Sequence, residues 1–423
     1  MAAPTSYRPR PHRSRSALWP SPLGELHESV RAVLENRIQR GLAAYAEEFK
    51  GVTSDGTVRT GLFDVEEIGH STQPLREAAQ HFLASLSAKK RANATFDIDS
   101  IEWRAWSNAH PFLFRHGICL HHLTEPQREA ALTLMRAGMS ERGFEAARNV
   151  MRLSEHLREL TDRPEEHGEW HYFISIFGAP SAELPWGWQI DGHHLNVNCL
   201  VLGDRVVMTP HLVGGEPLLA RSGIYAGACV LREEEAVGHA FMTSLSPQQR
   251  SKATLGDRLP RELLTTAPWD NFVMKYEGIR FDELTPAQRE RLGDVIGLYV
   301  GRLPAGHAEA KRREVEKYYR ETYFGWIGPV DDESPFYYRV YSPVILIEFV
   351  HQHGVAFDND EPTRNHAHAI VRTPNGNDYG KALLHSYRRR LAARDQLVRP
   401  NKAVAGSAAA QDEQQRINQV RGR

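Results

Sequence analysis

The chain has 423 residues, of which 41% are hydrophobic and 25% charged, a balance typical of soluble globular proteins. A formal net charge of −1 gives no electrostatic footprint for nucleic acid, so we expect no nucleic-acid partner. The three cysteines (Cys119, Cys199 and Cys229) are far apart and odd in number, which argues against a disulfide framework and favours a reducing cytoplasm. Without an apolar run of about 18 residues, neither a membrane span nor a membrane partner is expected.

The ends of the chain differ in composition from its centre. Residues 1–22 carry arginines without the apolar core of a secretory signal, and we expect them to form a disordered arm. Residues 396–423 are expected to be a flexible tail. Between them we predict one large domain (23–395), with a helical N-terminal part (23–165) followed by a part that holds the sheet and the site (166–395).

Three short segments share the pattern Leu, then Ser or Thr, then two residues, then Gln-Arg. They are LTEPQREAA from Leu123, LSPQQRSKA from Leu245 and LTPAQRERL from Leu284. A Ser or Thr followed three residues later by Gln is typical of a capping box, so each segment predicts a helix start. Because the intervals are unequal and no long repeat follows, we favour a reused helix start over a tandem repeat.

Strand-like runs gather in two groups. They are WHYFISIFG (170–178), GWQIDGHHLNVNCLVL (187–202) and RVVM (205–208), then FYYRVYSPVILIEFV (336–350) and HAIVR (368–372). Helical patterns at 285–302 and 306–321 separate the groups, and a last helix is expected from near Asp378. This order predicts an α+β fold with a mainly antiparallel sheet and a helical insertion, flanked by helices.

The late segment NHAHAIVR is the first candidate for metal chemistry. On a strand, His366 and His368 share one face with Arg372, and an H-x-H pair places two imidazoles at a spacing that suits one metal ion. Glu348 is the only ionisable residue in an otherwise largely apolar strand pattern, where a carboxylate is costly unless paired. It is therefore either a metal ligand or the partner of a core arginine such as Arg372 or Arg339.

The segment QIDGHHLNVN supplies further candidates. On a continuous strand His193 and His194 point to opposite faces, His194 together with Asn196 and Asn198. His193 shares its face with Asp191, and such a carboxylate–histidine pair can orient a metal ligand. We keep both histidines as candidate ligands.

Four other residues are candidates for the site, and three of them have two interpretations each. Asp378 is either the cap of the last helix or a general base, and His385 lies seven residues later on the same helical face. Trp186 and Trp188 lie two apart, and they either wall an apolar substrate pocket or pack in the core.

Taken in order, HYFISIFGAP, WGWQIDGHHLNVN, TP…GGEP, FGWIG, FYYRV…P…IEF, HAHAIVR and PNGNDYG…LLH resemble an uncharacterised family of bacterial and fungal proteins. It is catalogued as the domain-of-unknown-function family numbered thirty-five hundred, and the resemblance covers roughly residues 30–390. The resemblance implies that the family's recurring polar and glycine positions are Trp188, Gly192, His193, His194, Asn198, Glu348, His366, His368, Arg372, Asp378, Tyr379, Gly380 and His385.

We therefore expect a mononuclear metal-dependent enzyme, a hydrolase that acts on a small organic molecule through a metal-bound water. The candidate metal ligands are His193, His194, His366, His368 and Glu348. The candidate catalytic residues are Glu348, Arg372, Asp378 and His385, and the candidate substrate-binding residues are Trp186, Trp188, Asn196, Asn198 and Arg372. Zinc is favoured as the divalent ion, while iron, manganese or copper in an oxygenase suits the same ligands, and a non-enzymatic ligand-binding protein is the third alternative. The sequence does not predict an oligomeric state.

Overall fold

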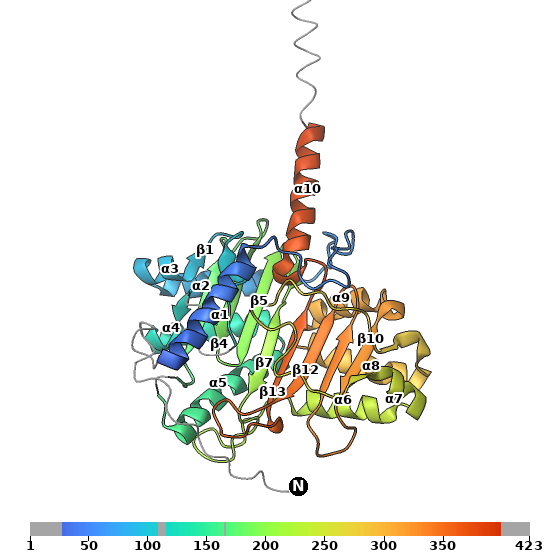
Figure 1. Cartoon of the computed structure of the whole chain (residues 1–423). Helices are drawn as coiled ribbons and strands as arrows, with labels where there is room; N and C mark the ends of the chain where they lie inside the picture. The colour runs from blue at the N-terminus through green and yellow to red at the C-terminus, as the bar shows by residue number, and fades with distance from the viewer. Residues whose placement is uncertain (1–27, 109–115, 165, 399–423) are drawn as a thin grey trace, which may run out of the picture.

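One long, mostly antiparallel sheet organises the residues that the structure describes, which are 28–108, 116–164 and 166–398 (Figure 1). The structure is a computed structural model. It confirms the predicted α+β class and the helical insertion between two groups of strands. The predicted arm (1–22) and most of the predicted tail lie outside the described residues.

Thirteen strands form the sheet, and ten α-helices surround it within the described residues. The strands are β1 (Thr95–Phe96), β2 (Ile118–Cys119), β3 (Tyr172–Phe177), β4 (Trp186–Gly192), β5 (Leu195–Leu202), β6 (Arg205–Val207), β7 (His211–Gly215), β8 (Thr254–Gly256), β9 (Ile279–Arg280), β10 (Tyr323–Ile327), β11 (Tyr337–Tyr341), β12 (Leu346–Gln352) and β13 (Thr363–Arg372). The helices are α1 (Glu28–Ala46), α2 (Gln73–Ser85), α3 (Ala88–Ala94), α4 (Glu125–Gly138), α5 (Glu141–Thr161), α6 (Arg232–Ser244), α7 (Pro247–Ala253), α8 (Pro286–Val300), α9 (Ala305–Glu316) and α10 (Lys381–Val398).

The predicted helix starts are confirmed at α4, α7 and α8, each of which begins with a capping box. At α8, Thr285 accepts a hydrogen bond from the backbone N–H of Gln288 (3.3 Å), whose side-chain oxygen accepts one from the N–H of Thr285 (2.9 Å). Ser246 and Gln249 repeat this exchange at α7. At these two starts, two N–H groups that lie beyond the internal hydrogen bonding of the helix are thus satisfied.

The strand order β1-β3-β4-β5-β7-β13-β12-β11-β10-β8 is symmetric about its centre. A constant shift in residue number carries the cross-strand pairs Phe173–Asp191 and Gln189–Asn198 onto Tyr323–Tyr341 and Arg339–Glu348. The short strands β1 and β8 run parallel to β3 and β10, and β2 and β9 run antiparallel to the same two strands. Residues 73–215 and 232–372 therefore have equivalent topologies.

This equivalence contradicts our preference for a reused helix start over a tandem repeat. HFLASLSAKKRANATF (81–96) matches AFMTSLSPQQRSKATL (240–255), and GICLHHLTEPQRE (117–129) matches GIRFDELTPAQRE (278–290). The helix starts are thus two pairs, the fourth being at Ser87, which caps α3 without the Gln-Arg signature. Helix α2 packs on α4 as α6 packs on α8. The chain therefore contains an internal repeat, in which each copy contributes one half of the sheet.

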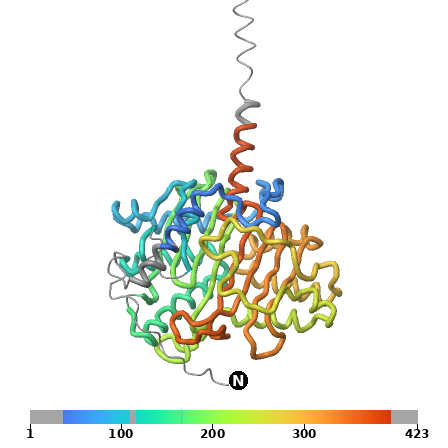
Figure 2. Tube along the Cα trace, in the orientation of Figure 1, coloured from blue at the N-terminus to red at the C-terminus, as the bar shows by residue number. Residues whose placement is uncertain are grey.

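The two faces of the sheet are covered differently. Helices α2, α4, α5, α6 and α8 contribute to a large apolar core on one face. The other face carries a smaller apolar cluster and is crossed by two equivalent segments. Residues 257–278 after β8 cross it in Figure 2, and residues 97–108 after β1 bind β4 and the turn after it through Trp103 and Asn108. These two segments bring polar residues to the centre of the sheet, where β7 and β13 meet.

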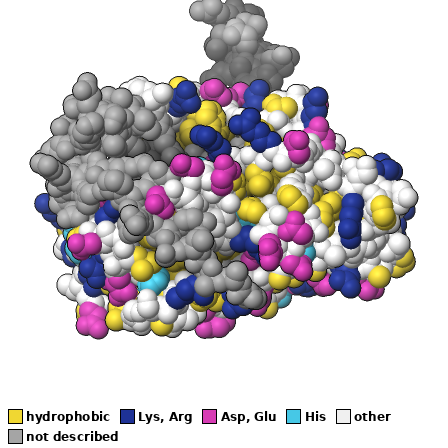
Figure 3. Space-filling view, turned by 60° about the horizontal axis from the view of Figure 1, so that its bottom comes forward, with side chains coloured by type: hydrophobic (Ala, Val, Ile, Leu, Met, Phe, Trp, Pro, Cys, Tyr) yellow, Lys and Arg dark blue, Asp and Glu magenta, His cyan; other side chains and the backbone are white. Residues whose placement is uncertain are grey.

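The last helix, α10, projects from the end of the sheet (Figures 1 and 2). Basic and acidic side chains are interspersed on the face shown in Figure 3. No helix among the described residues has both the length and the apolar character needed to cross a membrane.

Candidate metal centre

The two adjacent histidines form a turn. Strand β4 ends at Gly192 and β5 begins at Leu195, so His193 and His194 are the two-residue connection of a β-hairpin. His194 has a positive φ of 63°, and the two imidazole rings stack with centroids 3.8 Å apart. The prediction of one continuous strand with the rings on opposite faces is therefore wrong, because the reversal of the chain breaks the alternation.

Backbone hydrogen bonds hold this turn against two neighbouring segments. The N–H of His194 donates to the carbonyl of Asn108 (3.0 Å), and its carbonyl accepts from the N–H of Gly214 on β7 (2.8 Å). Because β7 pairs with β13, the turn is fixed beside the strand that carries His366 and His368. His193 instead stacks between the rings of His194 and His167.

The predicted convergence of distant histidines is confirmed. His194, His366 and His368 each offer a ring nitrogen, these atoms lie within 4.8 Å of one another, and all three residues are buried. Such a group could hold a metal ion. His193 and Glu348, also predicted as ligands, are not among the residues that the structure brings into this group.

Hydrogen bonds fix the orientation of two of the rings. The Nδ1 atom of His366 lies 2.7 Å from the carbonyl oxygen of His353, and Nδ1 of His368 lies 2.7 Å from a carboxylate oxygen of Glu262. A carbonyl and an ionised carboxylate can only accept, so we infer that both Nδ1 atoms carry the proton. The amide nitrogen of Gln352 lies equally close to Nδ1 of His368 (2.7 Å), so in this tautomer the Gln352 amide donates to Glu262 and not to the ring. The two Nε2 atoms then carry lone pairs, and they lie 3.2 Å apart.

Glu262 belongs to a polar network around His368 that the sequence analysis missed. Its carboxylate also accepts a hydrogen bond from the side-chain amide of Gln352 (2.7 Å), and the amide of Asn108 lies 3.3 Å from Nδ1 of His368. Gln352 is the last residue of β12. Glu262 and Asn108 come from the two equivalent crossing segments, which carry no local motif that marks a metal site.

A glycine makes room for one ring. Gly214 lies opposite His368 in the β7–β13 pair, and a Cβ atom at this position would come within 2.5 Å of Cδ2 of His368. Real Cβ atoms are not found so close to other atoms, so the first glycine of the GGEP segment allows the His368 ring to lie over β7.

Glu216, in the same segment, anchors a loop beside His366. Its buried carboxylate accepts hydrogen bonds from the backbone N–H groups of Val355 (2.9 Å), Ala356 (2.9 Å) and Phe357 (3.3 Å). It also lies 3.7 Å from Nδ1 of His366.

Burial affects the protonation of the ligand group. Burial, together with the neighbouring histidines, lowers the pKa of His194 well below its usual value, and burial also lowers the pKa of His366. Both rings are therefore neutral at neutral pH, which is the form that binds a metal ion.

The carboxylate of Glu348 is bound by backbone N–H groups and hydroxyls. Its fully buried carboxylate accepts hydrogen bonds from the N–H groups of Leu264 (3.0 Å) and Thr265 (3.1 Å), the hydroxyl of Tyr337 (3.0 Å) and the hydroxyl of Thr265. These donors offset the desolvation of the carboxylate, and among the described residues Glu348 forms no ion pair with an arginine.

The predicted catalytic residues Arg372, Asp378 and His385 do not gather at the histidines. Arg372 and Asp378 form a fully buried ion pair (2.7 Å), in which Arg372 also donates to the carbonyl of Thr265 and Asp378 accepts from the N–H of Thr373. Helix α10 begins after Asp378, and His385 is exposed on that helix.

The predicted substrate-binding residues are buried and packed. Trp186 and Trp188 lie fully buried in the large apolar core, and a Cβ at Gly138 of α4 would come within 2.6 Å of the Trp188 ring. The core interpretation of the tryptophans therefore holds, and they form no wall of the histidine site.

Asn196 and Asn198 form a buried hydrogen-bonded chain. The Asn198 amide donates to the side-chain oxygen of Asn196 (2.7 Å) and to the carbonyl of Pro210 (2.9 Å), and its own oxygen accepts from Gln189 (2.5 Å). These bonds link β4, β5 and the segment before β7, so the two asparagines stabilise the sheet beneath the site.

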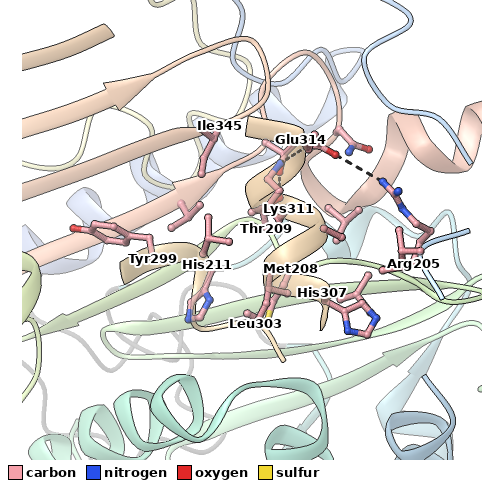
Figure 4. A pocket seen from close by; sticks show the side chains of 18 residues that line it. Arg205, Met208, Thr209, His211, Tyr299, Leu303, His307, Lys311, Glu314 and Ile345 are labelled. Atoms are coloured by element: carbon pink, nitrogen blue, oxygen red, sulfur yellow. Dashed lines mark hydrogen bonds and ion pairs between the residues drawn. The ribbon is translucent and has the colours of Figure 1, made fainter. Parts of the chain in front are cut away.

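A separate pocket lies between the sheet and the α8–α9 pair (Figure 4). Its lining is mainly apolar, with Met208, Leu303 and Ile345 among its residues. At one side Lys311 pairs with Glu314 (2.5 Å) and donates to the carbonyl of Val344. None of the three clustered histidines lines this pocket, so it is a different feature from the candidate metal centre.

The fold and the site together define an α+β protein with a buried group of three histidines that could hold a metal ion. The chain belongs to the family described as protein of unknown function (DUF3500), whose model matches residues 68–381. This match confirms the resemblance found in the sequence motifs. No curated protein and no solved structure matches the chain.

Proposed function

We propose that the protein is a mononuclear metal-dependent hydrolase. His194, His366 and His368 hold a divalent ion, and this ion activates a water molecule that attacks a small organic substrate. The single observation that carries the proposal is the pair of Nε2 atoms of His366 and His368, which face each other at 3.2 Å.

In the tautomers inferred above, two lone pairs face each other at this distance, and they repel each other unless a positive charge lies between them; an N–H···N hydrogen bond would require the other tautomer of one ring. Two nitrogen ligands of a tetrahedral zinc ion, with zinc–nitrogen bonds of about 2.0–2.1 Å, lie about 3.3–3.4 Å apart. The separation of the two Nε2 atoms is close to this value, and a nitrogen of His194 lies within reach of the same point.

The ligand set favours hydrolysis. Three neutral imidazoles leave the full charge of a divalent ion in place, and such a site lowers the pKa of a bound water to about 7. The set typical of iron oxygenases is two histidines and one carboxylate. The carboxylate predicted for that role, Glu348, is bound by backbone N–H groups. Zinc is therefore the ion that we propose.

Metal analysis of the purified full-length protein tests the proposal. The wild type is expected to contain about one zinc ion per chain, the His366→Ala variant almost none, and the His385→Ala control, altered on exposed α10, the wild-type amount. Removal of the ion by a chelator should abolish hydrolysis of a panel of small esters and amides, and zinc should restore it.

A wild type with far less than one ion per chain, unchanged in His366→Ala, would overturn the metal centre. Bound iron together with oxygen uptake, and no hydrolysis, would replace the hydrolase with an oxygenase.

A further inference from the structure

We infer that two buried glutamates, Glu216 and Glu348, are positioning residues of the metal centre. Each anchors a loop through backbone N–H groups, and each loop supplies the acceptor that orients one histidine. The inference rests on the proposed metal centre and extends it to residues that do not bind the ion.

The first chain of contacts runs from Glu348 to His368. Glu348 binds the N–H groups of Leu264 and Thr265, two and three residues after Glu262. Glu262 in turn lies 2.7 Å from Nδ1 of His368. Because these hydrogen bonds fix the backbone at 264–265, they also restrict the position of the nearby Glu262 carboxylate beside the His368 ring.

Arg372 binds the same loop from its other side. Its Nε and Nη2 atoms donate to the carbonyl of Thr265 (2.8 and 2.5 Å), while Asp378 balances its charge (2.7 Å). The N–H groups of the loop therefore donate hydrogen bonds to the carboxylate of Glu348, and the carbonyl of Thr265 accepts hydrogen bonds from the guanidinium of Arg372. Except for Leu264, which is of intermediate exposure, the residues that form these contacts are buried, where charge-assisted hydrogen bonds are strong.

The second chain of contacts runs from Glu216 to His366. Glu216 binds the N–H groups of Val355, Ala356 and Phe357, and the carbonyl of His353 accepts the hydrogen bond from Nδ1 of His366. Glu216 is nearest to Nδ1 of His366, at 3.7 Å, whereas the proposed ion would bind Nε2. Its carboxylate therefore acts on the loop and on the orientation of the ring.

The internal repeat supports a special role for Glu348. The equivalent position in the first half is Asn198, since the Gln189–Asn198 pair corresponds to Arg339–Glu348. Asn198 bonds to side chains and to one carbonyl, whereas Glu348 binds two N–H groups of the loop that carries Glu262. The carboxylate of Glu348, which can only accept hydrogen bonds, thus occurs in the second half of the repeat. The loop of this half carries Glu262, which orients the proposed ligand His368.

Loss of such outer contacts typically lowers metal affinity by about 10–100-fold. The test compares Glu216→Gln and Glu348→Gln with Glu234→Gln, all in the full chain. Glu234 is a matched control, because it is also buried and ion-paired, with Arg302 at 2.9 Å, but lies on α6 away from the histidines. Zinc affinity is measured by competition with a chelator, and unfolding in urea reports the stability of each variant.

We expect all three variants to lose stability and only Glu216→Gln and Glu348→Gln to bind zinc about 10–100-fold more weakly than wild type. The visible spectrum of the cobalt-substituted protein should change in the same two variants and not in Glu234→Gln. If a glutamine variant does not fold, the aspartate series Glu216→Asp, Glu348→Asp and Glu234→Asp, which keeps the charge, is compared in the same way.

Zinc affinity and a cobalt spectrum in the Glu216 and Glu348 variants equal to those of the Glu234 control would overturn the inference. A wild type that binds no ion would instead end the proposed function, so the two failures are distinguishable.

Discussion

The Nε2 atoms of His366 and His368 lie 3.2 Å apart, and acceptors on the far side of both rings leave each of these atoms with a lone pair. For His366 the acceptor is a backbone carbonyl, which no substitution of a side chain removes. For His368 it is the carboxylate of Glu262, and the amide nitrogens of Gln352 (2.7 Å) and Asn108 (3.3 Å) lie near the same Nδ1 atom, so the tautomer of this ring depends on exchangeable side chains.

We therefore expect Glu262→Gln to weaken zinc binding by about 10–100-fold, because an amide can donate to Nδ1 and so stabilise the tautomer whose Nε2 is protonated. Competition with a chelator measures the affinity. Glu277→Gln is the control, since Glu277 forms a partly exposed pair with Arg339 (2.9 Å). Equal affinities in the two variants would show that Glu262 does not select the tautomer.

Gly214→Ala should abolish stoichiometric zinc binding. The new Cβ would lie 2.5 Å from Cδ2 of His368 and 3.0 Å from the carbonyl of Ala367, so the ring must leave its position. Gly297→Ala is the matched control. Its Cβ meets nothing within 4 Å in the interior of α8, and the substitution should raise the free energy of unfolding by about 0.5–1 kcal/mol. Full zinc content in Gly214→Ala would contradict the predicted position of His368.

Asp378→Asn should lower the free energy of unfolding by about 3–5 kcal/mol, because it leaves the fully buried Arg372 without its counter-charge. Asp99→Asn, which breaks an exposed pair with Arg388, should cost less than about 1 kcal/mol. Urea unfolding measures both values. A loss in Asp378→Asn as small as that in the control would show that the buried pair is not structural.

The stability of the protein should fall as the pH is lowered below about 6.5. Burial, together with the neighbouring His121, lowers the pKa of the buried His171 from 6.5 to about 4. Between these values the unfolded chain takes up a proton that the folded chain does not. Stability from this residue is therefore complete above pH 6.5 and lost toward pH 4, by up to about 1.4 kcal/mol per pH unit.

Urea unfolding near neutral pH and near pH 5 measures this dependence. The His171→Gln variant should show a smaller loss than wild type, while His385→Gln, altered at an exposed position, should show the wild-type loss. An unchanged loss in His171→Gln would mean that His171 does not titrate differently in the folded and unfolded states.

Several features could be predicted because they depend on neighbouring residues alone. The period of two along a strand places His366 and His368 on one face, and the capping boxes at Thr124, Ser246 and Thr285 start helices. The motif order also identified the family. The internal repeat was hidden because Ser87 caps its helix without the Gln-Arg signature that the other starts share.

Other features required the tertiary structure. The residue pair at 193–194 fits a strand by composition, and only the pairing of Gly192 with Leu195 makes it a turn that directs His194 to β13. Glu348 fits a ligand by burial and charge, yet the N–H groups of Leu264 and Thr265 bind it. Glu262 belongs to no motif and lies beside His368 because its loop crosses the sheet.

The sequence by itself determined the α+β class, the helix starts, the H-x-H face and the family. The tertiary structure decided which polar groups surround those histidines. The physical reason is one of range: dihedral preferences and side-chain alternation act within a few residues, whereas the approach of Glu262 to His368 depends on strand order and loop packing across the whole sheet.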